Sequence, residues 1–86
     1  MQLKKGFVLR TVAGTNVVVP TGEDLNLNMM ITLNETGKLL WERLEKGAEP
    51  EELVAALLQE YDVDEQTATD HVEKFVGKLI EKGFLA

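Results

Sequence analysis

The side chains that commonly carry catalysis are scarce in this sequence. It contains no cysteine and no serine, so the usual thiol and hydroxyl nucleophiles reduce to threonine. The single histidine, His71, precedes Phe75 by one turn on the flank of a predicted helix. A lone histidine in such a place is more often surface or boundary packing than a general base. No nucleophile, base and orienting group stand together, and we predict that the chain is not an enzyme.

Metal and cofactor sites are equally hard to build from these residues. Without cysteine, the chain cannot form disulfides, thiolate zinc sites or cysteine-ligated iron–sulfur clusters. The acidic group of Glu49, Glu51 and Glu52 stands at a predicted helix start, where carboxylates offset the helix dipole, and its spacing does not match a calcium loop. Gly14 and Gly22 are isolated, which argues against a phosphate-binding loop. We expect no metal and no cofactor.

Composition indicates one globular domain spanning residues 1–86. The sequence is 44% hydrophobic and 28% charged, and nine basic residues stand against fifteen acidic ones. The formal charge of −6 weakens non-specific binding to nucleic acid. There is no apolar run of about 18 residues and no signal-peptide core. We therefore expect no membrane or nucleic-acid partner and a cytoplasmic location.

The first third of the sequence predicts strands. Residues 7–13 and 15–19 are rich in β-branched and apolar side chains around Gly14, which predicts a hairpin. Pro20 lacks an amide donor and should end the second strand. Residues 25–33 alternate between apolar and other side chains, which is typical of a strand with one buried face. Short connections favour an antiparallel meander of three strands.

The remainder predicts three helices. Asn34 can cap the first, although Thr32 and Glu35 also match a capping box, and Gly47 should end it. Pro50 suits the first turn of the second, whereas Asp64 should cap a third that ends at Gly83. Predicted core positions on the last two helices are Leu53, Val54, Leu57, Leu58, Tyr61, Val72, Val76, Leu79 and Ile80. The predicted fold is α+β with the order β-β-β-α-α-α.

The order and spacing of several segments resemble the PqqD family. These segments are residues 31–37 (ITLNETG) with Trp41 following, residues 51–54 (EELV) with 61–63 (YDV), residues 72–79 leading to 82–85 (KGFL), and residues 8–14 (VLRTVAG). The resemblance implies a winged-helix-like fold and a precursor-peptide recognition element for the modification of ribosomally made peptides. It implies that a leader peptide adds as a strand to the third strand, in the groove between that strand and the third helix. It also implies a partner enzyme, commonly a radical S-adenosylmethionine enzyme, that does the chemistry. Because the sequence looks more like general members of the family, we do not assign it to pyrroloquinoline quinone synthesis.

The candidate binding residues follow from this resemblance and from the predicted elements. As the last strand of a meander, the third strand has a free edge that can pair with an extended peptide, although its alternating apolar side chains would be core. Met30 lies on the opposite face and could adapt to a partner. Phe75, with Lys78 and Lys82 beside it, would suit apolar and acidic leader residues, although lysines near a helix end also complement its dipole. The predicted peptide-binding residues are Leu25, Leu27, Met29, Met30, Ile31, Thr32, Val72, Phe75, Val76, Lys78, Leu79 and Lys82.

Other functions stay open at this point. A winged-helix DNA-binding regulator is compatible with the fold class, although the net charge and the lack of arginine in the third helix count against it. A structural accessory subunit of an enzyme is a further alternative. Trp41 is expected in the core but could face such a partner protein. The free strand edge could also pair with a second copy of the chain.

Overall fold

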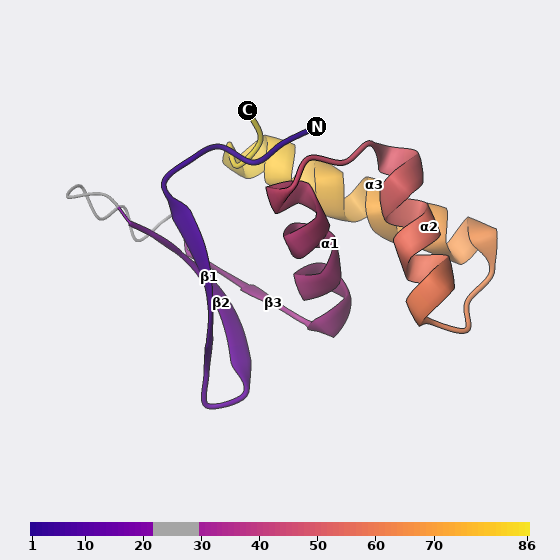
Figure 1. Cartoon of the computed structure of the whole chain (residues 1–86), viewed down its shortest axis with the longest axis horizontal. Helices are drawn as coiled ribbons and strands as arrows, with labels where there is room; N and C mark the ends of the chain where they lie inside the picture. Colours follow the sequence, from indigo (N-terminus) through magenta and orange to yellow (C-terminus); the bar gives the residue numbers. More distant parts are fainter. Residues whose placement is uncertain (22–29) are drawn as a thin grey trace.

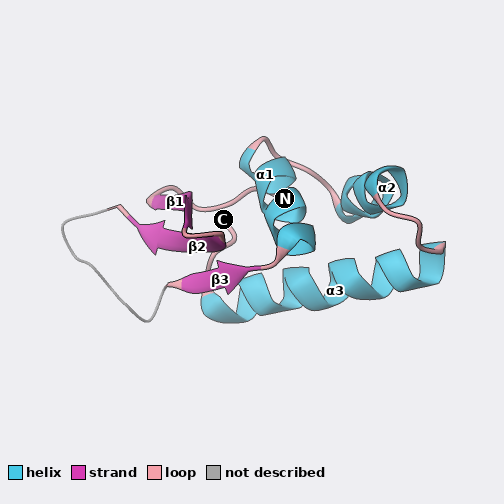
Figure 2. Cartoon of the chain, turned by 90° about the horizontal axis from the view of Figure 1, so that it is seen from below, coloured by secondary structure: helices cyan, strands magenta, loops and turns pink. Residues whose placement is uncertain are grey.

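Three strands are followed by three helices in a computed structural model that describes residues 1–21 and 30–86. The sheet lies on one side of the molecule and the helices on the other, and α3 runs past both α1 and α2 (Figure 1, Figure 2). The elements are β1 (Phe7–Val12), β2 (Thr15–Pro20), β3 (Ile31–Leu33), α1 (Glu35–Glu45), α2 (Pro50–Glu60) and α3 (Glu65–Lys82). This order confirms the predicted α+β fold.

The hairpin of β1 and β2 closes through a two-residue turn. Val12 pairs with Thr15, and the intervening Ala13 and Gly14 have φ angles of 52° and 80°. Two successive positive φ angles are the mark of a type I′ turn, whose twist matches that of the flanking strands. The hairpin projects away from the helices, and at its tip Val12 is 63% exposed (Figure 1).

The meander is antiparallel, with β2 between β1 and β3. Pro20 is the last residue of β2, as the sequence predicts. β3 begins at Ile31, and Met30 just before it is 42% exposed. The predictions for Leu25, Leu27 and Met29 lie outside the described residues.

Side-chain caps fix where α1 and α3 begin. Asn34 Oδ1 accepts a hydrogen bond from the Gly37 backbone N at 2.8 Å, which confirms Asn34 as the cap of α1. Asp64 Oδ1 accepts from the Thr67 backbone N at 2.7 Å at the start of α3. The hydrogen bonds from Thr67 stabilise the ionised carboxylate and lower the pKa of Asp64 below its ordinary value of 3.8.

The remaining helix ends follow the predicted chemistry. Pro50 occupies the first turn of α2, and Glu52 Oε1 accepts a hydrogen bond from the Glu49 backbone N at 3.0 Å. Gly47 follows α1 with a φ of 86°, and Gly83 ends α3 with a φ of 79°. Both glycines adopt the left-handed conformation that commonly closes helices.

An aromatic cluster lies at the centre of the core. Trp41 is 1% exposed and Phe84 is fully buried, and their ring centroids lie 5.6 Å apart in an edge-to-face arrangement. Phe7 of β1 packs against Phe84 in the same manner at 4.7 Å. These contacts confirm Trp41 as a core residue and join the sheet, α1 and the chain after α3. Other core residues include Val18, Ile31, Leu33, Leu40, Leu44, Leu53, Leu57, Val72 and Leu79.

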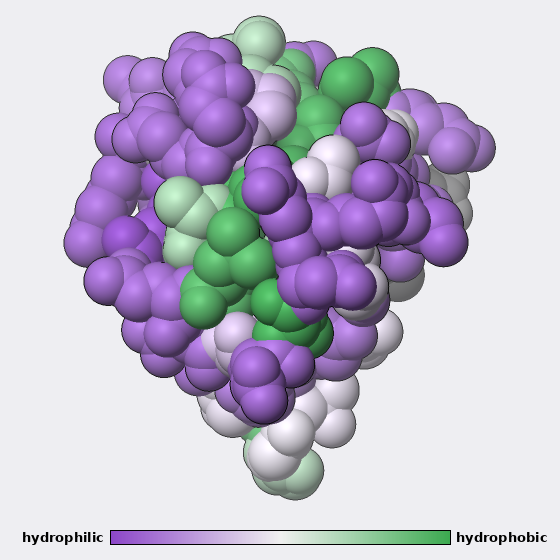
Figure 3. Space-filling view, turned by 90° about the vertical axis from the view of Figure 1, so that its right-hand side faces the viewer, coloured by the Kyte–Doolittle hydropathy of each residue, from purple (hydrophilic) through white to green (hydrophobic). Residues whose placement is uncertain are grey.

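Three residues predicted for the core are on the surface instead. Leu58 is 40% exposed, Tyr61 is 38% exposed and Ile80 is 62% exposed. Successive helical residues are rotated by about 100°, so a side chain next to the core stripe is buried only where a second element covers it. Figure 3 shows hydrophobic surface across the end of the molecule that carries α2 and the connection to α3.

A buried polar network connects the hairpin to α1. Asn16 in β2 is only 4% exposed. Its Oδ1 accepts a hydrogen bond from Thr11 Oγ1 at 2.9 Å, and its Nδ2 donates to Glu35 Oε1 at 3.3 Å. The buried amide is therefore satisfied on both sides, as buried polar groups in native proteins generally are.

The two ends of the chain lie beside each other (Figure 1). The Lys4 backbone N donates to Phe84 O at 2.8 Å, and Ala86 N donates to Gln2 O at 2.9 Å. None of the helices in the described residues combines the length and apolar character needed to cross a membrane.

Candidate peptide-binding site

The hairpin turn determines which backbone N–H and C=O groups of β2 point toward β1 and which point toward β3. In a two-residue hairpin the residues flanking the turn, here Val12 and Thr15, form the hydrogen-bonded pair. Backbone groups alternate in direction along a strand, so those of Thr15 and Val17 point toward β1. Those of Asn16 and Val18 then point toward β3.

Among the residues that the structure describes, this arrangement leaves one residue of β3 whose backbone groups have no partner strand. Leu33 lies opposite Asn16 and Ile31 lies opposite Val18, so both direct their N–H and C=O groups to β2. Thr32 lies opposite Val17 and directs its N–H and C=O to the other side, where the described residues provide no neighbouring strand. Because Ile31 and Leu33 bury their side chains in the core, the edge that Thr32 presents is rigidly supported.

A groove of about 200 Å³ begins where β3 ends and lies between the start of α1 and the middle of α3. Its lining residues are Asn34, Thr36, Gly37, Leu40, His71, Lys74, Phe75 and Lys78. Leu40 is buried at its base, and Phe75 is half-buried and packs against the core. The Phe75 ring lies close to the start of α1, since a Cβ at Gly37 would lie 3.4 Å from Phe75 Cε1.

The charged residues of this groove are basic. Lys74 and Lys78 are exposed, and together with His71 they recur at the three- and four-residue spacing that places side chains on one helix face. The single ion pair among the described residues joins the Met1 amino group to Glu49 at 3.1 Å, so neither lysine is neutralised by a carboxylate there. An apolar aromatic wall with two free ammonium groups suits an extended segment that carries apolar and acidic side chains.

The predicted site residues lie in several different environments. Phe75 and Lys78 line the groove, Thr32 is exposed on β3, and Met30 is exposed just before that strand. The side chains of Ile31, Val72 and Leu79 are 7%, 2% and 0% exposed and belong to the core, whereas Val76 is half-buried against it. Lys82 is exposed at the end of α3 and does not line the groove. The assignment of these residues to peptide binding stays a prediction.

Sequence reasoning missed much of the groove. The residues it did not assign to binding are Asn34, Thr36, Gly37, Leu40, His71 and Lys74. Two signals were available: a glycine near the start of a helix is costly unless something approaches it closely, and His71 and Lys74 share a helix face with Lys78.

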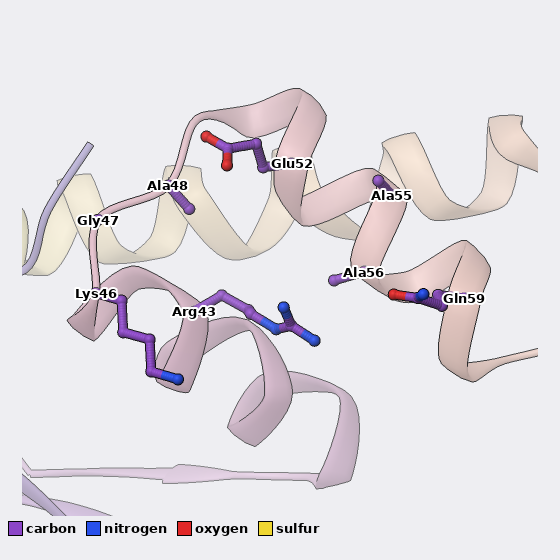
Figure 4. Close-up of a pocket in the computed structure, with 8 residues that line it drawn as sticks. All are labelled: Arg43, Lys46, Gly47, Ala48, Glu52, Ala55, Ala56 and Gln59. Carbon is purple, nitrogen blue, oxygen red and sulfur yellow. The ribbon is translucent and has the colours of Figure 1, made fainter.

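A separate cavity of about 360 Å³ lies between the end of α1 and α2 (Figure 4). Arg43 reaches from α1 toward α2, whereas Lys46 points away from it. Much of the remaining lining is small, with Ala48, Ala55 and Ala56. This cavity is lined by neither β3 nor α3, and it does not join the groove described above.

The fold and the site define a small α+β domain in which β3 has no second neighbouring strand among the described residues and a basic groove begins where that strand ends. Residues 10–85 match the family model described as Coenzyme PQQ synthesis protein D (PqqD). The chain belongs to the PqqD family, as the resemblance indicated.

Two solved structures are similar to this chain. One is described as TbiB1 in complex with the TbiA(beta) leader peptide; it has 27% sequence identity and a TM-score of 0.79, with 99% of this chain and 94% of that chain covered. The other, lasso peptide synthetase B1 complexed with the leader peptide, has 24% identity and a TM-score of 0.75 over 96% of this chain and 93% of that chain, and it bears on the fold alone. No curated protein sequence matches this chain significantly.

Proposed function

We propose that this chain binds the leader segment of a ribosomally made precursor peptide and presents it to a modifying enzyme. The observation that carries the proposal is the free backbone edge at Thr32, with the Phe75 groove beginning one residue after the strand. Membership of the PqqD family supports it, as does the description of the 27% identical structure as a complex with a leader peptide.

Strand addition would divide affinity and selectivity between two parts of the site. Backbone hydrogen bonds to Thr32 require no particular leader sequence, and each contributes about 0.5–1.5 kcal/mol net. Selectivity then comes from side chains that reach the groove. Phe75 favours an apolar leader residue, and Lys74 and Lys78 favour acidic ones. The preferred leader is therefore extended, with apolar and acidic residues close together.

The chemistry would belong to the partner enzyme. The resemblance to the PqqD family makes a radical S-adenosylmethionine enzyme the partner that we propose first, with another peptide-modifying enzyme as the alternative. Ribosomal precursor peptides are made in the cytoplasm, so we place the complex there. No feature of the described residues favours DNA binding, and the net charge of −6 opposes it.

One substitution tests whether the leader pairs with the backbone of β3 at Thr32. Because the Thr32 N–H points away from β2, Thr32→Pro removes an outward donor and leaves the pairing with β2 intact. Thr32→Val keeps the donor and serves as the control. With the labelled leader of the precursor encoded beside this chain, fluorescence anisotropy should give at least tenfold weaker binding for Thr32→Pro and binding within threefold of wild type for Thr32→Val.

Circular dichroism must first establish that both variants are folded. Equal affinity of folded Thr32→Pro and wild type would exclude strand addition at this edge. Absence of leader binding by the wild-type chain would overturn the proposed function as a whole.

A further inference from the structure

α3 separates two grooves of opposite charge. On the side of α1 it contributes His71, Lys74 and Lys78 to the groove described above. On the side of α2 a second groove of about 450 Å³ is lined by Pro50, Glu51, Val54, Ala55, Leu58, Glu65, Thr69, Val72 and Glu73. Every ionisable residue of this second groove is a glutamate, so the two grooves differ in sign as well as in position.

The second groove combines an apolar floor with an acidic border. Leu58 is 40% exposed and Val54 is half-buried, above the buried Val72. Hydrophobic surface between hydrophilic borders is visible at this end of the molecule (Figure 3). Within the described residues, Glu51, Glu65 and Glu73 form no ion pair. An exposed apolar strip with polar edges is typical of protein interaction sites.

We propose that this α2–α3 groove docks a segment of the modifying enzyme in which an apolar side chain is flanked by lysine or arginine. The apolar side chain would cover Leu58 and Val54, and the cations would meet the glutamates at the border. A symmetric dimer through this groove is disfavoured, because it would bring glutamate against glutamate. A head-to-tail contact with the basic groove of a second copy would occupy the leader-binding groove and compete with the leader. Nucleic acid and anionic membrane are repelled by the same carboxylates.

The geometry allows both partners to bind at once. A leader with acidic residues is attracted by Lys74 and Lys78 and repelled by the glutamates across α3, whereas a basic enzyme segment has the opposite preference. The inference rests on the proposed function only for the identity of the partner. The docking groove itself follows from the lining residues of α2 and α3.

A matched pair of double variants tests the docking groove. Leu58→Gln with Glu73→Lys changes the groove, whereas Ile80→Gln with Glu81→Lys makes the same chemical changes at exposed positions of α3 that line neither groove. The probe is the peptide-modifying enzyme encoded beside this chain, measured by biolayer interferometry with saturating leader. The groove variant should bind the enzyme at least tenfold more weakly, and the control variant should stay within twofold of wild type.

Leader affinity, measured separately, should stay within twofold for both variants. Equal losses of enzyme binding in the two variants would overturn the inference, as would unchanged binding by the groove variant or no binding of the enzyme by the wild-type chain. A wild-type chain that binds the enzyme but not the leader would contradict the proposed function alone. Failure of the docking inference and failure of the proposed leader-binding function therefore give different results.

Discussion

The ring of Phe75 lies close to Gly37 at the candidate leader groove: a Cβ at Gly37 would lie 3.4 Å from Phe75 Cε1. The same Cβ would lie 3.3 Å from Asn34 Oδ1 and 3.4 Å from Leu33 Cβ. Asn34 is fixed by its capping hydrogen bond, and Leu33 is fixed in the core. The ring of Phe75 is thus the neighbour that we expect to shift when residue 37 is enlarged.

Enlarging Gly37 should destabilise the protein. Gly37→Val adds methyl groups against three close neighbours, and overpacking of this kind costs about 1–3 kcal/mol. Gly37→Ala should cost less, because a gain in helix propensity of about 0.5–1 kcal/mol opposes the crowding. Urea unfolding measures both. A valine variant as stable as wild type would show that the space beside Phe75 is larger than described.

Charge reversal in the groove should weaken binding of an acidic leader. Lys74→Glu with Lys78→Glu replaces two attractive groups with repulsive ones, and we expect about tenfold weaker binding at low salt, with a smaller effect at high salt. Lys4→Glu with Lys5→Glu changes the net charge equally at exposed positions outside the groove. Isothermal titration calorimetry compares the two. Equal losses of leader affinity in the two double variants would mean that the net charge of the protein, and not the position of the lysines, determines binding.

Replacing the buried amide of Asn16 with a carboxylate should make the unfolding free energy of the protein depend on pH. Asn16→Asp would place a carboxylate in a 4% exposed site beside Glu35 Oε1, which lies 3.3 Å from the present amide nitrogen. Burial and the like charge should raise the folded-state pKa of the new group. We expect a loss of about 1–3 kcal/mol in unfolding free energy at pH 7.

That loss should shrink as the pH falls through the raised pKa, because the protonated acid no longer repels Glu35. Urea unfolding at pH 7 and pH 5 measures the change. Adding Glu35→Gln should remove much of the penalty at pH 7. A penalty that is equal at both pH values would contradict the burial of this network.

The cap of α3 predicts a loss of stability in acid. The pKa of Asp64 is lower in the folded protein than its ordinary value of 3.8, so its contribution is complete well above that pH. It disappears as the pH falls through the lowered pKa. Asp64→Asn keeps a capping acceptor that does not titrate. The melting temperatures of wild type and Asp64→Asn should converge between pH 7 and pH 3, and a constant difference would contradict this assignment.

Local chemistry was sufficient to predict much of the fold. Asn34 and Asp64 cap helices and Gly83 ends one because those residue types satisfy the free backbone groups at helix ends. Gly14 marks the hairpin turn because the turn requires a positive φ there. These features depend on residues only a few positions apart, which a sequence shows directly.

Long-range relationships could not be predicted in the same way. Periodicity predicts Leu58 and Ile80 in the core stripes of their helices, but it does not show which side of a helix another element covers, and both residues are exposed. The contact of Phe75 with Gly37 joins α3 to α1, and neither residue alone indicates the other. From the sequence we expect a groove between the third strand and the third helix, whereas the groove lined by Phe75 and Lys78 lies between α3 and α1. The role of these two residues in peptide binding stays a prediction.

The most direct test of the account is amide hydrogen exchange, followed by NMR, with and without the leader of the adjacent precursor peptide. The account predicts that bound leader slows exchange of the Thr32 N–H, which points away from β2, and shifts the amide signals of residues 30–34 and 71–78 saturably. Unchanged exchange at Thr32, with protection appearing instead along the open edge of β1 (Phe7–Val12), would contradict it.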